Sequence, residues 1–127
     1  MITLDWIPVI CRKIGRNSVG RRYVHNRLRE LQQALAAWLD QQNDCADKLS
    51  ENALSRGERS NMAIFCGLLK KELTLLKIAV ANIELWSNGG GDVSLTRAQK
   101  AYSQAQDIWK RRMSMLQKMT VYPQRYV

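Results

Sequence analysis

The fold is decided by residues 60–87, which read SNMAIFCGLLKKELTLLKIAVANIELWS. Alternating steps of three and four residues through this stretch meet apolar side chains at all seven positions: Met62, Cys66, Leu69, Leu73, Leu76, Val80 and Ile83. This spacing places them along one side of an α-helix, where they can pack against a partner helix. The stretch therefore predicts one long helix with a continuous apolar seam that closes near Trp86 or Ser87.

A second seam precedes this helix. The same spacing from Ile7 to Leu49 meets apolar residues at ten of thirteen positions, which predicts a first helical arm over residues 7–52 that packs along the second. Gly15 and Gly20 interrupt the pattern, and each Gly inside a helix costs about 1 kcal/mol relative to Ala. We therefore expect fraying or a bend in the first arm at this point.

Turn-forming residues divide the remaining chain. Ser55 and Gly57 indicate a hairpin tip at 53–59, and the three glycines at 89–91 disfavour an uninterrupted helix. The second arm is therefore expected over 60–87 and 94–120. The predicted fold class is all-α: a single domain, residues 1–127, that forms a long antiparallel two-helix coiled-coil hairpin whose second arm is interrupted near the triple glycine.

The overall composition excludes several classes of protein. The 127 residues include nine Gly and Pro together and one Phe, which favours helix over sheet. No apolar run approaches the roughly 20 residues of a membrane-spanning helix, and Asp5 and Pro8 argue against a cleaved secretory signal. Three cysteines without a metal-ligand spacing indicate neither a disulfide framework nor a zinc site. We expect a soluble, cytoplasmic protein.

Charge is distributed unevenly along the chain. Residues 1–29 hold seven Lys or Arg against one acid (+6), 30–57 hold two against five (−3), and 97–127 hold seven against one (+6). An antiparallel hairpin would bring the two basic terminal segments together at one end and leave the acidic segment at the other. The predicted basic end indicates an acidic protein partner or nucleic acid.

The residue pattern offers no catalytic or cofactor site. His25 is the only histidine and no Ser or Cys is spaced to be activated by it. The acidic face Asp40, Asp44, Asp47 and Glu51 is interpreted as solvated, and Cys45 and Cys66 as small apolar residues that pack across the hairpin. We therefore expect a protein that is not an enzyme and that holds no metal, no cofactor and no small-molecule substrate.

One stretch carries a family resemblance. WLDQQND at 38–44 continuing to Leu49, then Ser60-Asn61 and the apolar helix that follows, resembles the FliJ/YscO family of type III secretion and flagellar export stalk proteins. The resemblance covers roughly residues 20–120. It implies a short basic antiparallel coiled coil, similar to the central stalk of a rotary ATPase, that couples ATP hydrolysis to protein export.

The resemblance also implies partners and contact residues. The export ATPase hexamer, the cytoplasmic domain of an export-gate protein and secretion chaperones are the expected partners, in the cytoplasm at the inner-membrane export apparatus. The gate-contacting face would comprise Trp38, Gln41, Cys45, Leu69, Leu73, Leu76 and Val80. The ATPase ring would contact the basic end through Arg12, Lys13, Arg16, Arg21, Arg22, Arg27, Lys110, Arg111 and Arg112.

Two other classes of function fit the sequence. The basic end could serve as a phosphate clamp for nucleic acid, which is less favoured because the aromatic residues lie mostly on the seams instead of between the arginines. A secretion chaperone or a self-associating structural subunit is the other alternative, because a two-helix hairpin leaves apolar surface that can dimerise.

Overall fold

The computed structural model describes residues 2–53 and 55–125, and side chains only as far as Met119. This part of the chain forms four α-helices: α1 (Trp6–Gly15), α2 (Arg21–Glu51), α3 (Arg56–Ser87) and α4 (Asp92–Arg125). The all-α prediction is confirmed. The interruption of the second arm at the triple glycine is also found, but the two-helix hairpin is not, because the chain reverses its direction at both glycine-containing stretches and forms four helices.

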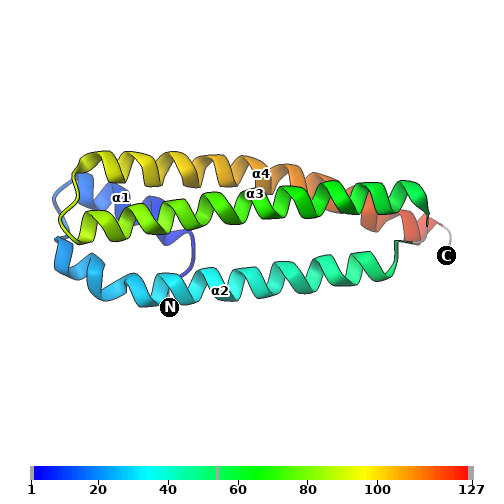
Figure 1. Cartoon of the computed structure of the whole chain (residues 1–127), viewed down its shortest axis with the longest axis horizontal. Helices are drawn as coiled ribbons and strands as arrows, with labels where there is room; N and C mark the ends of the chain where they lie inside the picture. The colour runs from blue at the N-terminus through cyan, green and yellow to red at the C-terminus, as the bar shows by residue number, and fades with distance from the viewer. Residues whose placement is uncertain (1, 54, 126–127) are drawn as a thin grey trace.

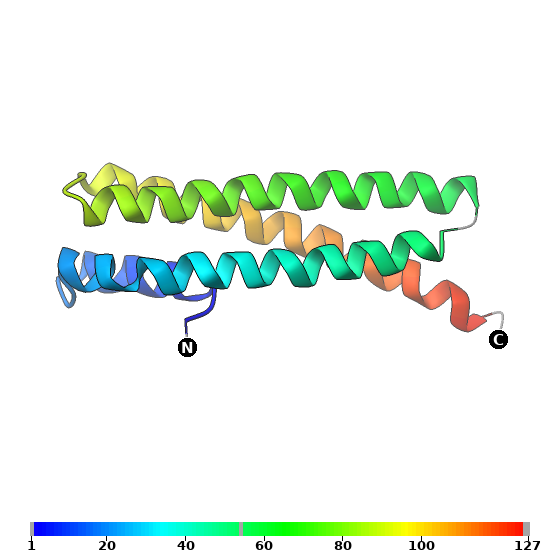
Figure 2. The same ribbon diagram turned by 60° about the horizontal axis from the view of Figure 1, so that its bottom comes forward.

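Each of the three long helices runs antiparallel to the next one along the chain, so α2 and α4 point in the same direction, and α1 covers one end of the bundle (Figure 1). Helix α3 packs against both α2 and α4, while α1 packs against α4. Turned by 60°, the view shows that α4 crosses the α2–α3 pair at an angle (Figure 2). Because α1 is much shorter than the other three helices, the half of the bundle that contains α1 has four helices and the other half has three.

The first glycine-containing stretch reverses the chain between α1 and α2. Asn17 adopts a left-handed backbone conformation, with φ 57°, which Asn tolerates better than most residues. The Asn17 amide donates to the Ile14 carbonyl and the Ser18 amide to the Lys13 carbonyl, both at 2.9 Å. These two bonds form a Schellman motif that closes α1. The first arm is therefore not one helix over 7–52.

The triple glycine makes a second reversal of the same kind. Gly89 has φ 106°, and the Gly89 amide donates to the Trp86 carbonyl at 3.1 Å and the Gly90 amide to the Leu85 carbonyl at 2.8 Å. Only glycine adopts this φ at low cost. The chain consequently turns back here, and α4 packs along α3 instead of continuing its direction.

The apolar core has two parts. The larger part joins all four helices, with Ile10 of α1, Leu31 of α2, Ile83 of α3 and Ala98 of α4 fully buried or nearly so. The smaller part is centred on Phe65 of α3 and lies at the end where α2 meets α3. Its members are Ala46, Met62 and Phe65, with the partly buried Leu49, Ala53, Cys66, Met115, Leu116 and Met119 around them.

This packing changes the expected charge layout. The last described turns of α4 lie at the α2–α3 end of the bundle, since Met115, Leu116 and Met119 pack there. The prediction that the two basic terminal segments lie together is therefore wrong. The C-terminal half of α4, with Lys110, Arg111 and Lys118, runs beside the acidic half of α2, whereas α1 packs against the first half of α4.

Candidate protein-docking surface

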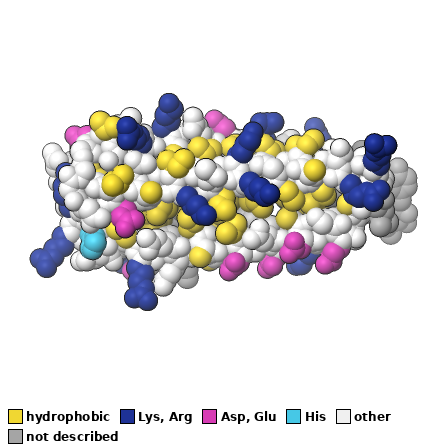
Figure 3. All heavy atoms as spheres, viewed as in Figure 1, with side chains coloured by type: hydrophobic (Ala, Val, Ile, Leu, Met, Phe, Trp, Pro, Cys, Tyr) yellow, Lys and Arg dark blue, Asp and Glu magenta, His cyan; other side chains and the backbone are white. Residues whose placement is uncertain are grey.

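The end of the bundle formed by the α1–α2 and α3–α4 turns carries a group of exposed basic side chains. Arg12, Lys13, Arg16 and Arg22 are all exposed, and in the described part of the chain none of the four forms an ion pair. We call these four residues the basic end. Figure 3 shows Lys and Arg projecting at this end and a row of acidic side chains along the other half of α2.

Arg21 lies at the same end but has a structural role. Its Nη1 donates to the Trp86 carbonyl and, at 2.8 Å, to the Gly90 carbonyl. Its guanidinium carbon lies 4.5 Å from the centroid of the Trp86 ring. A cation is favourable at the C-terminal end of α3, where backbone carbonyls lack helical partners. Arg21 thus ties the start of α2 to the α3–α4 turn.

Arg27 is also engaged within the chain. It pairs with Glu30 one turn later at 3.0 Å, and its guanidinium carbon lies 5.5 Å from the centroid of the Tyr23 ring. The hydrogen bond and charge of Glu30 raise the pKa of Arg27 above its usual value. Arg27 is therefore less free to meet a partner than the residues of the basic end.

The other three residues that were predicted to contact the ATPase ring lie elsewhere on the molecule. Lys110 and Arg111 are exposed on the C-terminal half of α4, away from the basic end. Arg112 has no exposed surface, so its assignment to an exposed basic surface is wrong. Its register explains the burial, because Arg112 follows Ala105 by seven residues on the seam of α4.

Arg112 forms a buried polar layer between the two parts of the core. Its Nε donates to Glu72 Oε1 at 2.7 Å and its Nη1 to Gln42 Oε1 at 2.9 Å, and its guanidinium carbon lies 5.3 Å from the Phe65 ring centroid. Burial raises the pKa of Glu72, while the Arg112 charge acts in the opposite direction. The layer joins α2, α3 and α4 through one side chain from each.

The residues expected to contact an export gate are divided by burial. Leu69, Leu76 and Val80 are buried in the bundle, because antiparallel neighbours on both sides of α3 cover these positions. They are not available as a surface, and this part of the prediction is wrong. Trp38, Cys45 and Leu73 are half-buried, and Gln41 is exposed.

Sequence reasoning missed a second polar contact, which fastens the segment before α1. The Tyr102 hydroxyl donates to Asp5 Oδ1 at 2.9 Å and accepts from Gln106 Nε2 at 2.9 Å. Burial, followed by the neighbouring Asp5 charge, raises the pKa of Tyr102 to about 12. No sequence signal pairs residues 97 positions apart, although the i, i+4 spacing of Tyr102 and Gln106 is a local one.

The Tyr102 phenol predicts a loss of stability at high pH. A phenol in the unfolded chain titrates near pH 10, whereas the folded value is about 12. The folded state therefore favours the neutral phenol. Its contribution is complete below about pH 10 and is lost as the pH rises toward the folded value.

Urea unfolding of wild type and Tyr102→Phe at about pH 9 and about pH 11 measures this coupling. The wild type should lose more stability over this interval than Tyr102→Phe, with Tyr23→Phe on the exposed face of α2 as the matched control. Equal pH dependence in wild type and Tyr102→Phe would show that the Tyr102 proton is not linked to folding.

The three cysteines form no disulfide in the described part of the chain. Cys11, Cys45 and Cys66 are all free, and burial raises the pKa of Cys11 to about 11. Within the same range no three His, Cys, Asp or Glu side chains are grouped so that they could hold a metal ion. None of the described helices has the length and apolar character needed to cross a bilayer.

Comparison of the chain with known protein families, with characterised proteins and with solved structures finds no match. The functional assignment therefore depends on the surface chemistry described above and on the short resemblance in the sequence.

Proposed function

We propose that this chain is an adaptor of a type III secretion or flagellar export apparatus, which docks through its basic end onto the acidic surface of an export ATPase ring. In this role it hydrolyses nothing itself and couples ATP turnover in the ring to the export gate. One observation carries the proposal: Arg12, Lys13, Arg16 and Arg22 are exposed together at one end, and none of them has an ion-pair partner among the residues that the structure describes.

The tertiary arrangement supports this choice of surface. The C-terminal basic segment lies beside the acidic half of α2, as shown by the Arg112–Gln42 hydrogen bond, and its Arg112 is paired with Glu72 inside the bundle. The basic end lacks such a neighbouring acidic row, although Glu84 and Asp92 are exposed in the adjacent helix ends. An acidic partner surface relieves the repulsion among like charges that are held close together, and it also increases the rate at which the two proteins associate in the correct orientation.

The four-helix bundle differs from the two-helix coiled coil that the FliJ/YscO resemblance implies. The family resemblance supplies the identity of the partner, and the basic end supplies the physical reason for binding. Gate contact is assigned to Trp38, Gln41, Cys45 and Leu73, the expected residues that keep some exposure.

Charge reversal at the basic end tests the proposal. The Lys13→Glu/Arg16→Glu variant should bind a purified type III export ATPase about tenfold more weakly than wild type, and should lose its effect on ATP turnover. Arg111→Glu/Lys118→Glu reverses two exposed charges on the C-terminal half of α4 and is the matched control, which should bind like wild type. Binding would be followed by fluorescence anisotropy of labelled chain at two salt concentrations.

Two results would contradict the proposal. One is the absence of binding to the ring together with unchanged ATP turnover. The other is a gel shift with random DNA or RNA at physiological salt that Lys13→Glu/Arg16→Glu abolishes, which would assign the basic end to nucleic acid.

A further inference from the structure

The outward face of α3 carries an apolar stripe that the bundle does not cover. Ile64, Ile78 and Leu85 are 53%, 42% and 55% exposed. They are spaced by fourteen and seven residues, so they lie on the same side of the helix. Exposed apolar side chains are common singly, but three aligned on one helix face indicate a surface that meets another molecule.

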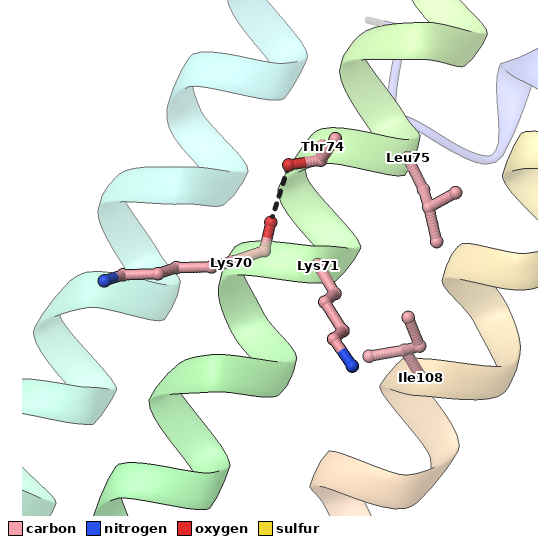
Figure 4. Close-up of a pocket in the computed structure, with 5 residues that line it drawn as sticks. All are labelled: Lys70, Lys71, Thr74, Leu75 and Ile108. Atoms are coloured by element: carbon pink, nitrogen blue, oxygen red, sulfur yellow. Dashed lines mark hydrogen bonds between the residues drawn. The ribbon is translucent and has the colours of Figure 1, made fainter.

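A shallow groove of about 400 Å³ lies beside this stripe, between α3 and α4. Its lining is Lys70, Lys71, Thr74, Leu75 and Ile108. In Figure 4, Leu75 and the end of Lys71 point across the groove toward Ile108, whereas Lys70 extends in the opposite direction, toward α2. The Thr74 hydroxyl donates to the Lys70 carbonyl at 3.0 Å, so its polar group is already satisfied and the groove remains apolar at its centre.

The rim of the groove is basic. On α3, the exposed Lys71 reaches across the groove (Figure 4). On α4, the exposed Gln104 and Arg111 lie one turn before and after Ile108 on the same side of the helix. The nearest acid on α4 is Asp107, also exposed. The space-filling view shows dark blue Lys and Arg side chains among the apolar surface of this face (Figure 3).

From this combination we infer that the α3–α4 groove is a second docking site, which binds an amphipathic helix whose apolar stripe is flanked by Asp or Glu. A helix laid in the groove would place apolar side chains on Leu75, Ile78 and Ile108 and carboxylates against Lys71 and Arg111. Helices commonly bind in this way, with apolar anchors spaced by three, four and seven residues. The acids provide orientation and encounter rate, and the anchors provide most of the affinity.

A second copy of this chain fits the groove less well. The acidic row of α2, with Asp40, Asp44 and Asp47, is accompanied on its exposed side by Gln41 and Asn43. It has carboxylates without an adjoining stripe of large exposed apolar residues. A partner that supplies both features on one helix matches the groove and its rim better.

This inference does not rest on the proposed function. The groove is formed by the middle of α3 and α4, whereas the basic end belongs to α1 and the start of α2. Substitutions in one surface are therefore expected to leave binding at the other unchanged, so either proposal can fail alone.

A synthetic probe tests the site with the full chain. The probe is a fluorescein-labelled amphipathic peptide of about 20 residues, with Leu at the apolar positions and Glu on both flanks. The comparison peptide has Lys in place of Glu. Fluorescence anisotropy at about 0.05 M and about 0.3 M salt should show tighter binding of the Glu peptide and a weakening at the higher salt.

Two pairs of variants locate the binding. Lys71→Glu/Arg111→Glu should weaken binding of the Glu peptide about tenfold or more, whereas Lys13→Glu/Arg16→Glu, which reverses two charges at the basic end, should not. Ile78→Ser should weaken it, whereas Tyr23→Ser removes an aromatic side chain of equal exposure, 42%, on another helix and should not. Circular dichroism establishes that each variant keeps its helix content.

Several outcomes would overturn the inference. The first is equal affinity for the Glu and Lys peptides, and the second is an equal effect of each variant and its control. The third is that the chain does not bind the Glu peptide but binds anionic phospholipid vesicles, and that Ile78→Ser abolishes the vesicle binding. The fourth is a dimer in sedimentation that Ile78→Ser dissociates. The last two would assign this face to a membrane or to a second copy of the chain.

Discussion

Arg112→Met should destabilise the bundle by about 3–5 kcal/mol, because it leaves the Glu72 carboxylate buried without its cation. Arg112 has no exposed surface and donates to Glu72 at 2.7 Å. Glu72→Met should have a comparable effect, since it leaves the guanidinium with only Gln42 as a hydrogen-bond partner. The free energy of unfolding, measured by urea denaturation, gives both values.

The double variant Glu72→Met/Arg112→Met separates pairing from packing. Replacing a buried ion pair with apolar residues of similar volume is often close to neutral, so the double variant should recover most of the stability that each single variant loses. The exposed neighbour substitution Arg111→Met is the matched control and should change stability little. If Arg112→Met is as stable as Arg111→Met, the buried layer does not hold the three helices together.

Arg112→Met should also change how the free energy of unfolding depends on pH. Burial already raises the pKa of Glu72, and removal of Arg112 takes away the interaction that lowers it. A carboxyl whose folded pKa lies above the unfolded value contributes stability at low pH and loses it as the pH rises. Arg112→Met should therefore be less destabilised near pH 5 than near pH 7, relative to wild type under the same conditions.

Gly90→Ala should destabilise the protein by about 1–3 kcal/mol through strain at the α3–α4 reversal. A Cβ on Gly90 would lie 2.7 Å from the Leu85 carbonyl oxygen, and that oxygen already accepts the Gly90 amide. The Leu85 oxygen belongs to the backbone, so it cannot move away from the added Cβ without opening the turn. Thermal and urea unfolding would measure the loss.

Gly91→Ala is the control for this substitution, because a Cβ at Gly91 meets nothing within 4 Å. It changes the same residue type in the same turn and should be tolerated. Equal stability of the two alanine variants would contradict the tight reversal, and would favour the straighter second arm that the sequence alone suggested.

Apolar periodicity was enough to predict that the chain is helical. Seam positions such as Ile83 lie in the core, since a continuous apolar stripe at this spacing is buried only when a helix packs on another element. The glycines were also recognised as breaks. For the candidate site, four of the nine basic residues proposed from the sequence are exposed at one end of the bundle, and within the described part of the chain none of these four forms an ion pair.

The direction of each break was decided only by tertiary structure. Glycine at 15, 20 and 89–91 permits a bend, an interruption or a full reversal, because it has several accessible backbone conformations. The reversal is selected by packing: α1 and α4 bury Ile10 and Ala98 only when they fold back onto the α2–α3 pair. This selection also decides which charges become neighbours.

Arg112 shows the same division. The sequence determines that it lies on the seam of α4 and within a basic segment, and these two facts suggest opposite locations. Its burial depends on Glu72 and Gln42, which are 40 and 70 residues away and reach it only through the antiparallel order of α2, α3 and α4. Helical spacing is a local property that the sequence states directly, whereas the partner of a buried charge depends on contacts between distant segments.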